Sequence, residues 1–481
     1  SRGLGDVYKR QVFLLPCIIF ALHLIFVRLY DMSSMQLLPY KQQVSSLLRL
    51  GLPIVVGQLG MIILGLADTI MIGHHSTEEL AAAAFVNNVF NLAIIFATGF
   101  SYGLTPLIGM LQGWGNTQGI GRIFRNALSA NASVAVLLTA VMYTVYCFVD
   151  KLGQPEELLP HIRPYFVLQL ISLLFIMLFN GFRQFAEGLT DTRTPMWILL
   201  GGNALNIFGN YLLIYGSFGF PEWGLFGAGV STLVSRIVML LIFIGVVAVA
   251  RRYKVYREAI LRSRFNRNDF MQLNALGWPI ALQMGMETAA FSLSAIMVGW
   301  LGSIPLAAHQ IMISVSTIGF MVYYGMGAAL AVRVSHFMGQ KDFPNLRRAV
   351  NSGMGIILSL AIVASLFFYL ARTPIIYSFT EDHEVMVVVS SLIFSLIVYQ
   401  FGDALQITFA NALRGTTDVK PMMWIAFFSY FIVALPVGYL CGFTWGGGVV
   451  GVWVAFPAGL FTAGFLFWLR FRYRLQQLMK K

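Results

Sequence analysis

Three carboxylates stand inside long apolar stretches of this chain: Asp68, Glu287 and Asp403. A charge at the centre of a bilayer costs about 3 kcal/mol or more, so such residues face the protein interior and are candidates for function. Carboxylate oxygens are the hard ligands that small cations prefer, and a carboxyl group can also take up a proton. The three acids therefore predict a site at which Na⁺ and H⁺ compete for the same oxygens.

The neighbours of two acids extend this prediction to a cation-coupling site in the C-terminal half. Tyr399 and Asp403 are four residues apart, as are Gln283, Glu287 and Phe291, so each set shares one face of a helix. A phenol and an amide supply further oxygen ligands, and the Phe291 ring can hold a cation over its face. We predict Glu287, Asp403, Tyr399 and Phe291 as the cation-coupling residues, with Na⁺ at the two acids and Gln283 as a secondary member.

A second polar cluster is predicted in the N-terminal half. Asn203, Asn206 and Asn210 share one face of a helix. They can join Asp68 of the first span and Thr232 of the sixth. Asparagines also bridge membrane helices in a purely structural way, so a structural role stays open for them.

The composition excludes soluble classes of protein. Of 481 residues, 58% are apolar and 11% are charged, whereas soluble domains are about 45–50% apolar and about 25% charged. Nucleic-acid-binding domains, soluble enzymes and secreted disulfide scaffolds are thereby ruled out. Cys17, Cys147 and Cys441 are odd in number and far apart, so they form no disulfide or metal framework.

The hydropathy pattern predicts an all-α polytopic membrane protein with twelve transmembrane helices. A span needs about 20 apolar residues. The predicted spans are 50–73, 83–111, 126–149, 163–186, 195–216, 225–250, 274–300, 308–337, 350–371, 385–413, 421–442 and 447–470.

The charges of the connections predict the orientation of these spans. The odd-numbered connections hold three basic residues, Lys151, Arg163 and Arg372, against nine acidic ones. The even-numbered connections and the tails from Met32 hold 24 Lys and Arg against six acids, if Arg183, Arg333 and Arg470 near the ends of predicted spans are counted with them. By the positive-inside rule both termini are cytoplasmic. The orientation of the spans thus accounts for the net charge of +12, and no nucleic-acid partner is expected.

Residues 1–31 are interpreted as a non-native or upstream extension. The segment 6–11 resembles a translated transposase end, and 12–30 is a single apolar run that could be a leader, an extra span or translated upstream DNA. We favour the last of these, with a natural start at Met32 or Met35.

An internal repeat divides the chain into two halves. Residues 51–54 (Gly-Leu-Pro-Ile) recur at 277–280 (Gly-Trp-Pro-Ile), and at the same offset Gly99, Gly113 and Arg122 meet Gly325, Gly339 and Arg348. Six spans in each half keep the same orientation, so a pseudo-twofold axis runs along the membrane normal. We predict six-helix bundles at 32–250 and 271–481, joined by a basic cytoplasmic linker at 251–270.

The acids are not duplicated in this repeat. The counterparts of Asp68, Glu287 and Asp403 are Ser294, Met61 and Ile176. The architecture common to both halves therefore does not require them. No nucleotide-binding loop of the form G-x-x-x-x-G-K-[ST] is present, so an ion gradient is the predicted energy source, with no cofactor.

The chain resembles the multidrug and toxic compound extrusion (MATE) family in its NorM-like branch, from about Met35 to Lys481. The resemblance rests on the doubled six-span layout and on these residues: Gly51-Leu52-Pro53 with Asp68, 188–195 (Gly-Leu-Thr-Asp-Thr-Arg-Thr-Pro), Asn206, Asn210, Glu287, Tyr399 and Asp403. It implies efflux of amphipathic, mostly cationic drugs in exchange for Na⁺ or H⁺. Proton-coupled relatives of another branch carry Asp where this chain has Asn210, which favours Na⁺.

The predicted protein is thus a monomeric antiporter of the bacterial cytoplasmic (inner) membrane, not an enzyme, whose partners are cationic drugs and dyes, Na⁺ or H⁺, and the lipid bilayer. The alternative is a flippase of lipid-linked saccharide, whose anionic head group calls for a basic cavity. Among the deep residues we count three acids against one arginine, Arg236, and this favours cationic cargo. Arg236 is also a candidate structural partner for a buried acid.

Overall fold

The computed structural model describes residues 38–480, so our interpretation of residues 1–31 lies outside the described residues. Twelve helices in this part of the chain are long and apolar enough to cross a membrane, which confirms the predicted all-α membrane fold. The first six spans are α2 (Tyr40–His75), α3 (Thr77–Ser101) continued by α4 (Leu104–Gly113), α5 (Thr117–Cys147), α6 (Leu159–Gly188), α7 (Arg193–Ile214) and α8 (Gly224–Val249).

The second six spans follow the short helix α9 (Lys254–Arg262). They are α10 (Arg267–Gly299), α11 (Ser303–Gln340), α12 (Phe343–Leu370), α14 (His383–Gly415), the span from α15 (Lys420–Phe427) through α16 (Leu435–Tyr439), and α17 (Gly448–Trp453) with α18 (Ala455–Met479). The short helix α13 (Arg372–Phe379) precedes α14. Two π-helical segments, η5 (Phe428–Ala434) and η6 (Leu440–Thr444), interrupt the eleventh span.

Most observed helices are longer than the predicted spans, because each helix continues through polar residues at its ends. Side-chain caps stabilise these polar ends. Asn116 accepts a hydrogen bond from the backbone of Gly119 at 2.8 Å, and Asp342 accepts one from Asn345 at 3.1 Å. Side-chain caps of this kind replace the missing backbone partners of a first helical turn. The two caps are repeat counterparts at the offset of 226 residues, so the repeat extends to the turns.

A second pair of turns repeats in the same way. Thr190 and Thr417 both have a positive φ, 65° and 58°. The amide of Thr190 donates to Glu187 O and that of Thr417 to Arg414 O, at 2.8 and 2.9 Å. This left-handed turn ends α6 and α14 after their last buried residues.

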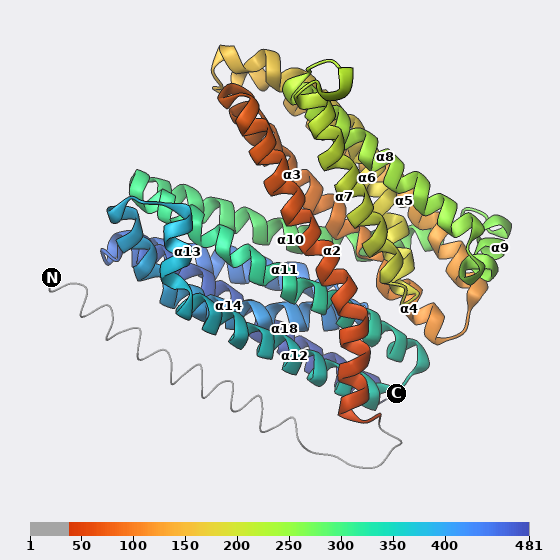
Figure 1. The fold of residues 1–481 in the computed structure, drawn as a ribbon. Coiled ribbons are helices and arrows are strands. Elements are labelled where there is room, and N and C mark those ends of the chain that lie inside the picture. Colours follow the sequence, from red (N-terminus) through yellow and green to blue (C-terminus); the bar gives the residue numbers. More distant parts are fainter. Residues whose placement is uncertain (1–37, 481) are drawn as a thin grey trace.

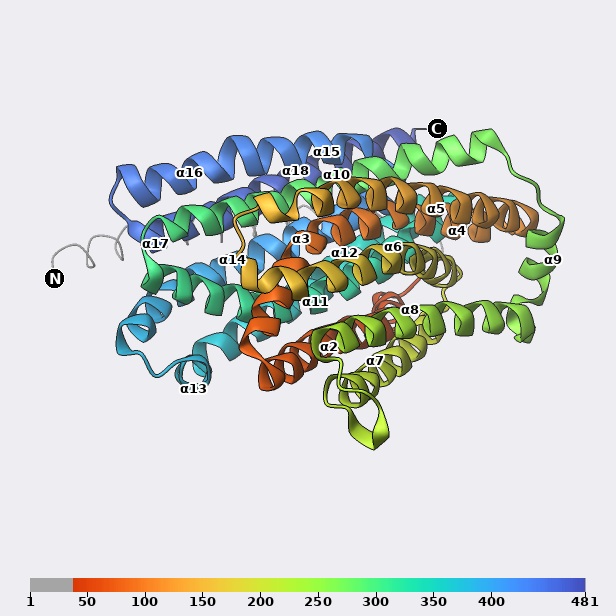
Figure 2. The same cartoon turned by 90° about the horizontal axis from the view of Figure 1, so that it is seen from above.

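The two halves are close at one end and spread apart at the other. In Figure 1 the ribbons of α2–α8 and α10–α18 are close near α9 and the C-terminus, and they diverge toward the end that carries α13. Figure 2 shows the same halves from above, with α9 at the edge of the molecule. Every side-chain hydrogen bond between the halves in residues 38–480 belongs to the α9 end, including Arg333 to Gln43 at 3.2 Å and Arg348 to Leu38 O at 3.1 Å.

Glycines allow the two backbones to meet at this end. A Cβ added to Gly99 of α3 would lie 2.8 Å from Cα of Ala281 in α10. A Cβ added to Gly325 of α11 would lie 2.9 Å from the backbone nitrogen of Val55 in α2. Ala281 and Val55 are themselves repeat counterparts, so these are two copies of one contact.

A second pair of repeat counterparts, Gly113 and Gly339, makes equivalent contacts between the halves. A Cβ on Gly113 would lie 2.3 Å from His336 O, and a Cβ on Gly339 would lie 2.2 Å from Met110 O. These two contacts also interchange under the repeat. Contacts related in this way are those expected around the pseudo-twofold axis that the sequence predicts.

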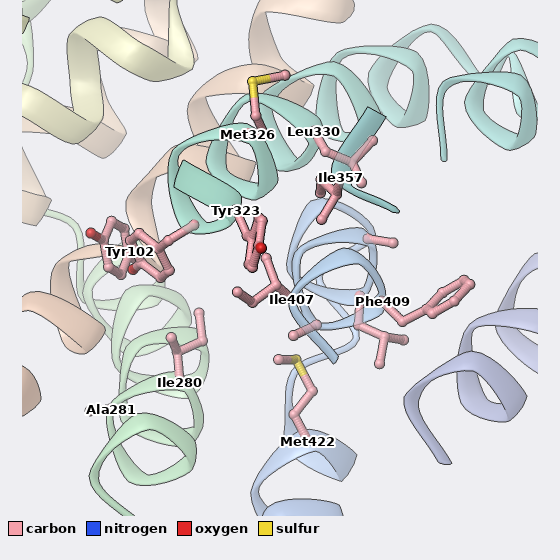
Figure 3. Packing of buried hydrophobic residues seen from close by; sticks show 14 of the residues in the cluster. Tyr102, Ile280, Ala281, Tyr323, Met326, Leu330, Ile357, Ile407, Phe409 and Met422 are labelled. Carbon is pink, nitrogen blue, oxygen red and sulfur yellow. The ribbon is translucent and has the colours of Figure 1, made fainter. Parts of the chain in front are cut away.

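The apolar core near the interface contains residues of both halves. Figure 3 shows Tyr102 of the N-terminal half beside Ile280 of α10, with Tyr323 and Met326 of α11 above Ile407 of α14. The Tyr102 ring also packs edge-on against Tyr324, with centroids 5.8 Å apart. The apolar core at the interface is therefore built by both halves.

Candidate functional site

Glu287 lies where α10 faces α14, and it is held by two amides. Its Oε2 accepts hydrogen bonds from Nε2 of Gln283 at 3.0 Å and from Nε2 of Gln406 at 3.1 Å. Gln283 is one helical turn earlier on the same face, as the spacing predicted. The Glu287 side chain is partly exposed, so its second oxygen is available to a ligand.

Asp403 is a buried carboxyl group of α14 that no side chain or backbone group of the described residues satisfies. Its side chain is fully buried, and neither carboxylate oxygen has a hydrogen-bond partner in residues 38–480. The Glu287 carboxyl is near enough to act on it electrostatically. Buried polar groups in native proteins are nearly always paired, so both Asp403 oxygens are free to accept a further partner. The donor set therefore fits a small cation that binds to oxygen.

Aromatic rings close the site. The Phe291 ring stacks on Phe456 of α18, with centroids 4.8 Å apart, and meets the Tyr399 ring edge-on at 6.2 Å. The hydroxyl of Tyr430, which lies near both carboxyl groups, also lacks a hydrogen-bond partner among the described residues. Phe291, Phe456 and Tyr430 share the wall of a small pocket. The structure thus brings together all five residues predicted for this half.

Tyr430 and Gln406 belong to the site but were missed from the sequence. Gln406 is three residues after Asp403, a signal that helical spacing alone could have found. Tyr430 lies within the π-helical segment η5, where an extra residue per turn shifts the side chains that follow, so α-helical spacing fails there. Single π-helical turns within α-helices are frequent at functional sites.

Arg414 is a third missed residue. It was placed in a connection because the tenth span was predicted to end at residue 413, but α14 continues to Gly415 and Arg414 is buried. Its Nη2 donates to Oε1 of Gln283 at 2.8 Å. Its guanidinium also lies 5.8 Å from the ring centroid of Tyr102 in the other half. Gln283 therefore joins the carboxylate of Glu287 to a cation at the interface of the halves.

The expected excess of deep acids over arginines is wrong. Arg183 and Glu187 form a buried ion pair of 2.7 Å in α6, and Arg333 of α11 is also inside a span. Arg183 and Arg333 lie inside the predicted spans 163–186 and 308–337 but were counted with the connections. Charge counting from the sequence therefore does not decide the sign of the cargo.

The N-terminal cluster forms as predicted, and its acid is well satisfied. Nδ2 of Asn210 donates to Asp68 Oδ1 at 2.6 Å. The Asn206 amide is best oriented with its nitrogen donating to Asp68 at 3.0 Å and its oxygen accepting from the Thr232 hydroxyl at 3.1 Å. Asp68 is partly exposed. This carboxylate is thus held by two amides from α7.

Asn203 and Arg236 take other positions. Asn203 is buried against Gly60, and its amide nitrogen has no partner in the described part of the chain. Arg236 makes no ion pair with an acid of the described chain; it donates to Gln169 Oε1 at 3.1 Å and to the Ser172 hydroxyl. Its charge is near enough to Asp68 to act on it. The two polar clusters share no hydrogen bond in residues 38–480.

A family model described as MatE matches residues 53–212 and 279–440, one stretch in each half. The chain belongs to the MatE family. It is 30% identical over 448 residues to the "Multidrug resistance protein NorM" of Photobacterium profundum, a match that covers 90% of this chain and 96% of that protein. This confirms the resemblance to MATE transporters of the NorM type.

Solved structures show the same fold. The outward-facing conformation of a multidrug resistance MATE family transporter matches with a TM-score of 0.82 at 20% identity, over 93% of this chain and 100% of that one. The eukaryotic MATE transporter AtDTX14 matches with a TM-score of 0.81 at 16% identity, over 92% and 99%. A MOP superfamily transporter from Pyrococcus furiosus Vc1 (DSM3638), described as having a binding pocket of reverse polarity, matches with a TM-score of 0.80 at 20% identity, over 91% and 97%. The protein is therefore a multi-pass membrane protein with the MATE fold.

Proposed function

We propose that this protein is a secondary active antiporter that exports amphipathic, mostly cationic drugs in exchange for Na⁺ or H⁺. The observation that carries the proposal is Asp403, a buried carboxylate without a hydrogen-bond partner in the described chain, next to the partly exposed Glu287. A buried unpaired charge is costly unless a cation binds to it. The similarity to a multidrug resistance protein of the NorM type supports drugs as the cargo.

The two halves supply the alternating access. They pack together at the α9 end and diverge at the α13 end (Figure 1), as an outward-facing state requires. Cation binding at Glu287 and Asp403 favours release of drug outside; loss of the cation inside lets drug bind again. Each elementary charge that enters across 100 mV contributes about 2.3 kcal/mol, so one or two ions drive a modest uphill gradient.

Arg414 connects the cation site to the gate between the halves. Its guanidinium contacts Gln283 and lies over Tyr102. A cation at Glu287 changes the charge that Arg414 feels through Gln283, and Arg414 in turn contacts the half that must move. The same residue thus responds to the ion and contacts the opposite half.

Na⁺ is the proposed coupling ion. Asp403, Glu287, Tyr399 and Tyr430 offer carboxylate and hydroxyl oxygens, the hard ligands that suit an alkali cation. In the N-terminal half Asn210 stands beside Asp68 and donates to it, so this cluster holds one carboxylate where a proton carrier of the other branch would hold two.

The topology follows from the charges of the connections. We infer a monomer in the bacterial inner membrane with both termini in the cytoplasm. In this arrangement 32–250 and 271–481 are the two bundles and 251–270 is the cytoplasmic linker, of which Arg267–Phe270 already belong to α10.

The decisive experiment is ethidium transport in everted vesicles with Na⁺ and pH gradients imposed separately. We expect a Na⁺ gradient alone to drive ethidium uptake, and Glu287→Gln vesicles to show none. Transport driven only by a pH gradient would assign coupling to H⁺. Equal transport by the wild type and by Glu287→Gln would overturn the proposed site.

The second candidate is a flippase of lipid-linked saccharide. The buried Arg414, which has no acidic partner among the described residues, favours it, because its guanidinium could bind an anionic head group. A flippase leaves ethidium efflux unchanged, so the same vesicles distinguish the two functions.

A further inference from the structure

A pocket opens in the C-terminal half between α12, α14 and α18. It lies where α12 begins and α18 ends, and Phe409 of α14 lines its inner side. Its rim is polar and its walls are apolar. The residues that matter for its chemistry are Arg347, Asn351, Phe409, Trp468, Arg472 and Leu475.

Two arginines at this pocket have no acidic partner. Neither Arg347 nor Arg472 forms an ion pair within residues 38–480, and Arg472 lies over the Trp468 ring at 5.1 Å. Two other arginines nearby are already engaged. Arg348 donates to Leu38 O at 3.1 Å, and Arg470 binds Asp418 at 2.7 Å.

The residues of α18 at this pocket are those typical of the boundary between hydrocarbon and head groups. From Trp468 to Gln476, α18 rises about 12 Å, and the apolar part of the helix gives way to Arg470, Arg472 and Arg474 over this stretch. Tryptophan is typical of this interface, and arginine there attracts anionic lipid. Arg347 belongs to the first turns of α12, where the helix dipole also favours an anion.

We propose that this pocket binds an anionic glycerophospholipid of the leaflet on the α9 side. Arg347 and Arg472 hold the phosphodiester, and Asn351 and Gln476 are placed to bond its ester or glycerol oxygens. The acyl chains lie along the wall formed by Phe471 and Leu475. Charge complementarity selects an anionic head group, and the apolar wall selects a lipid over a soluble phosphate. The proposal is independent of the cargo and of the coupling ion.

The test measures lipid retention by the purified full-length protein with native mass spectrometry. The probes are dioleoylphosphatidylglycerol and dioleoylphosphatidylcholine, titrated separately. The test variant is Arg347→Gln/Arg472→Gln. The control is Arg262→Gln/Arg264→Gln, which removes the same charge from two exposed linker arginines. Gel filtration of each variant checks folding.

We expect the wild type and the control to retain phosphatidylglycerol over phosphatidylcholine. The double variant should lose about tenfold in apparent affinity for the anionic lipid, because each basic residue at a membrane surface contributes a several-fold preference. Trp468→Leu should weaken both lipids alike.

Three results would overturn the proposal. The first is unchanged phosphatidylglycerol binding in Arg347→Gln/Arg472→Gln. The second is an equal loss in the control, which would mean a diffuse charge effect. The third is displacement of the lipid by soluble glycerophosphate at millimolar concentration, which would make this a site for free anions.

Discussion

The two halves share one helical frame but hold their acids in opposite ways. In the N-terminal half Asp68 is partly exposed and accepts hydrogen bonds from Asn210 and Asn206. In the C-terminal half Asp403 is fully buried and has no hydrogen-bond partner among the described residues. A carboxylate that amides already satisfy gains little from a cation. A carboxylate without partners gains much.

This contrast shows that similar helix packing can support two different uses of an acid. The repeat counterparts of the acids are Ser294, Met61 and Ile176, so neither cluster is part of the duplicated frame. The asymmetric residues carry the chemistry, and the symmetric ones carry the interface. Substitutions made in one half at a time therefore test whether the two clusters differ in function.

The largest effect is expected from the acids of the C-terminal half. Asp403→Asn and Glu287→Gln remove the charge that the cation neutralises, so Na⁺-driven ethidium efflux should fall more than about tenfold, the change that a loss of 1.4 kcal/mol produces. Asp403→Asn should keep or raise the melting temperature, because it removes an unpaired buried charge. Full drug resistance in cells with either variant would contradict this assignment.

A smaller effect on transport is expected from Asp68→Asn, with a larger effect on stability. The substitution turns a carboxylate that accepts from two amides into an amide that faces them, a loss of about 1–3 kcal/mol. We expect a lower melting temperature, efflux reduced a few-fold and an unchanged Na⁺ dependence. A Na⁺ titration of transport checks this; loss of Na⁺ dependence would place coupling in the N-terminal half.

The interface glycines should respond equally in both halves. Gly99→Ala and Gly325→Ala each push a Cβ into the backbone of the opposite half, at a cost of about 1–3 kcal/mol. We expect both variants to shift the conformational equilibrium by a similar amount away from the state that is closed at the α9 end. Thiol labelling of a cysteine introduced at that end measures the shift. Gly65→Ala is the control, because a Cβ there meets nothing within 4 Å. Unequal shifts would mean that the two contacts are not equivalent.

The smallest effect is expected from Arg414→Gln. This change removes a positive charge near Glu287, so Na⁺ should bind a few-fold more tightly while turnover slows, since release at the inner side becomes harder. Arg236→Gln is the matched change near Asp68 and should leave the Na⁺ affinity unchanged. Na⁺ titrations of both variants measure the difference, and weaker Na⁺ binding in Arg414→Gln would reverse the electrostatic argument.

The sequence predicts the spans and most members of each cluster for simple reasons. Apolar length defines a span, and four-residue spacing places Gln283 with Glu287 and Tyr399 with Asp403 on shared faces. Contacts between helices are not encoded in this spacing. Asn203 has the spacing of Asn206 and Asn210 but lies against Gly60, because the crossing with α2 directs it there.

Helix ends and irregular turns explain what the sequence did not reveal. Arg414 was missed because the hydropathy falls before α14 ends. The repeated turn after Gly188 and Gly415 marks the true ends of α6 and α14. Tyr430 was missed because a π-helical turn alters the residue that faces the site. Both are cases in which backbone geometry overrides the average period.

The paired glycine contacts have a consequence for the origin of the molecule. In a twofold homodimer, residue i of one subunit contacts residue j of the other, and j contacts i in return. Gly99 with Ala281 and Gly325 with Val55 follow this rule within one chain. The halves thus meet as two copies of one six-helix subunit would. Such an interface requires only the residues that form it to match in both halves, and Asp68, Glu287 and Asp403 lie at positions where the halves differ.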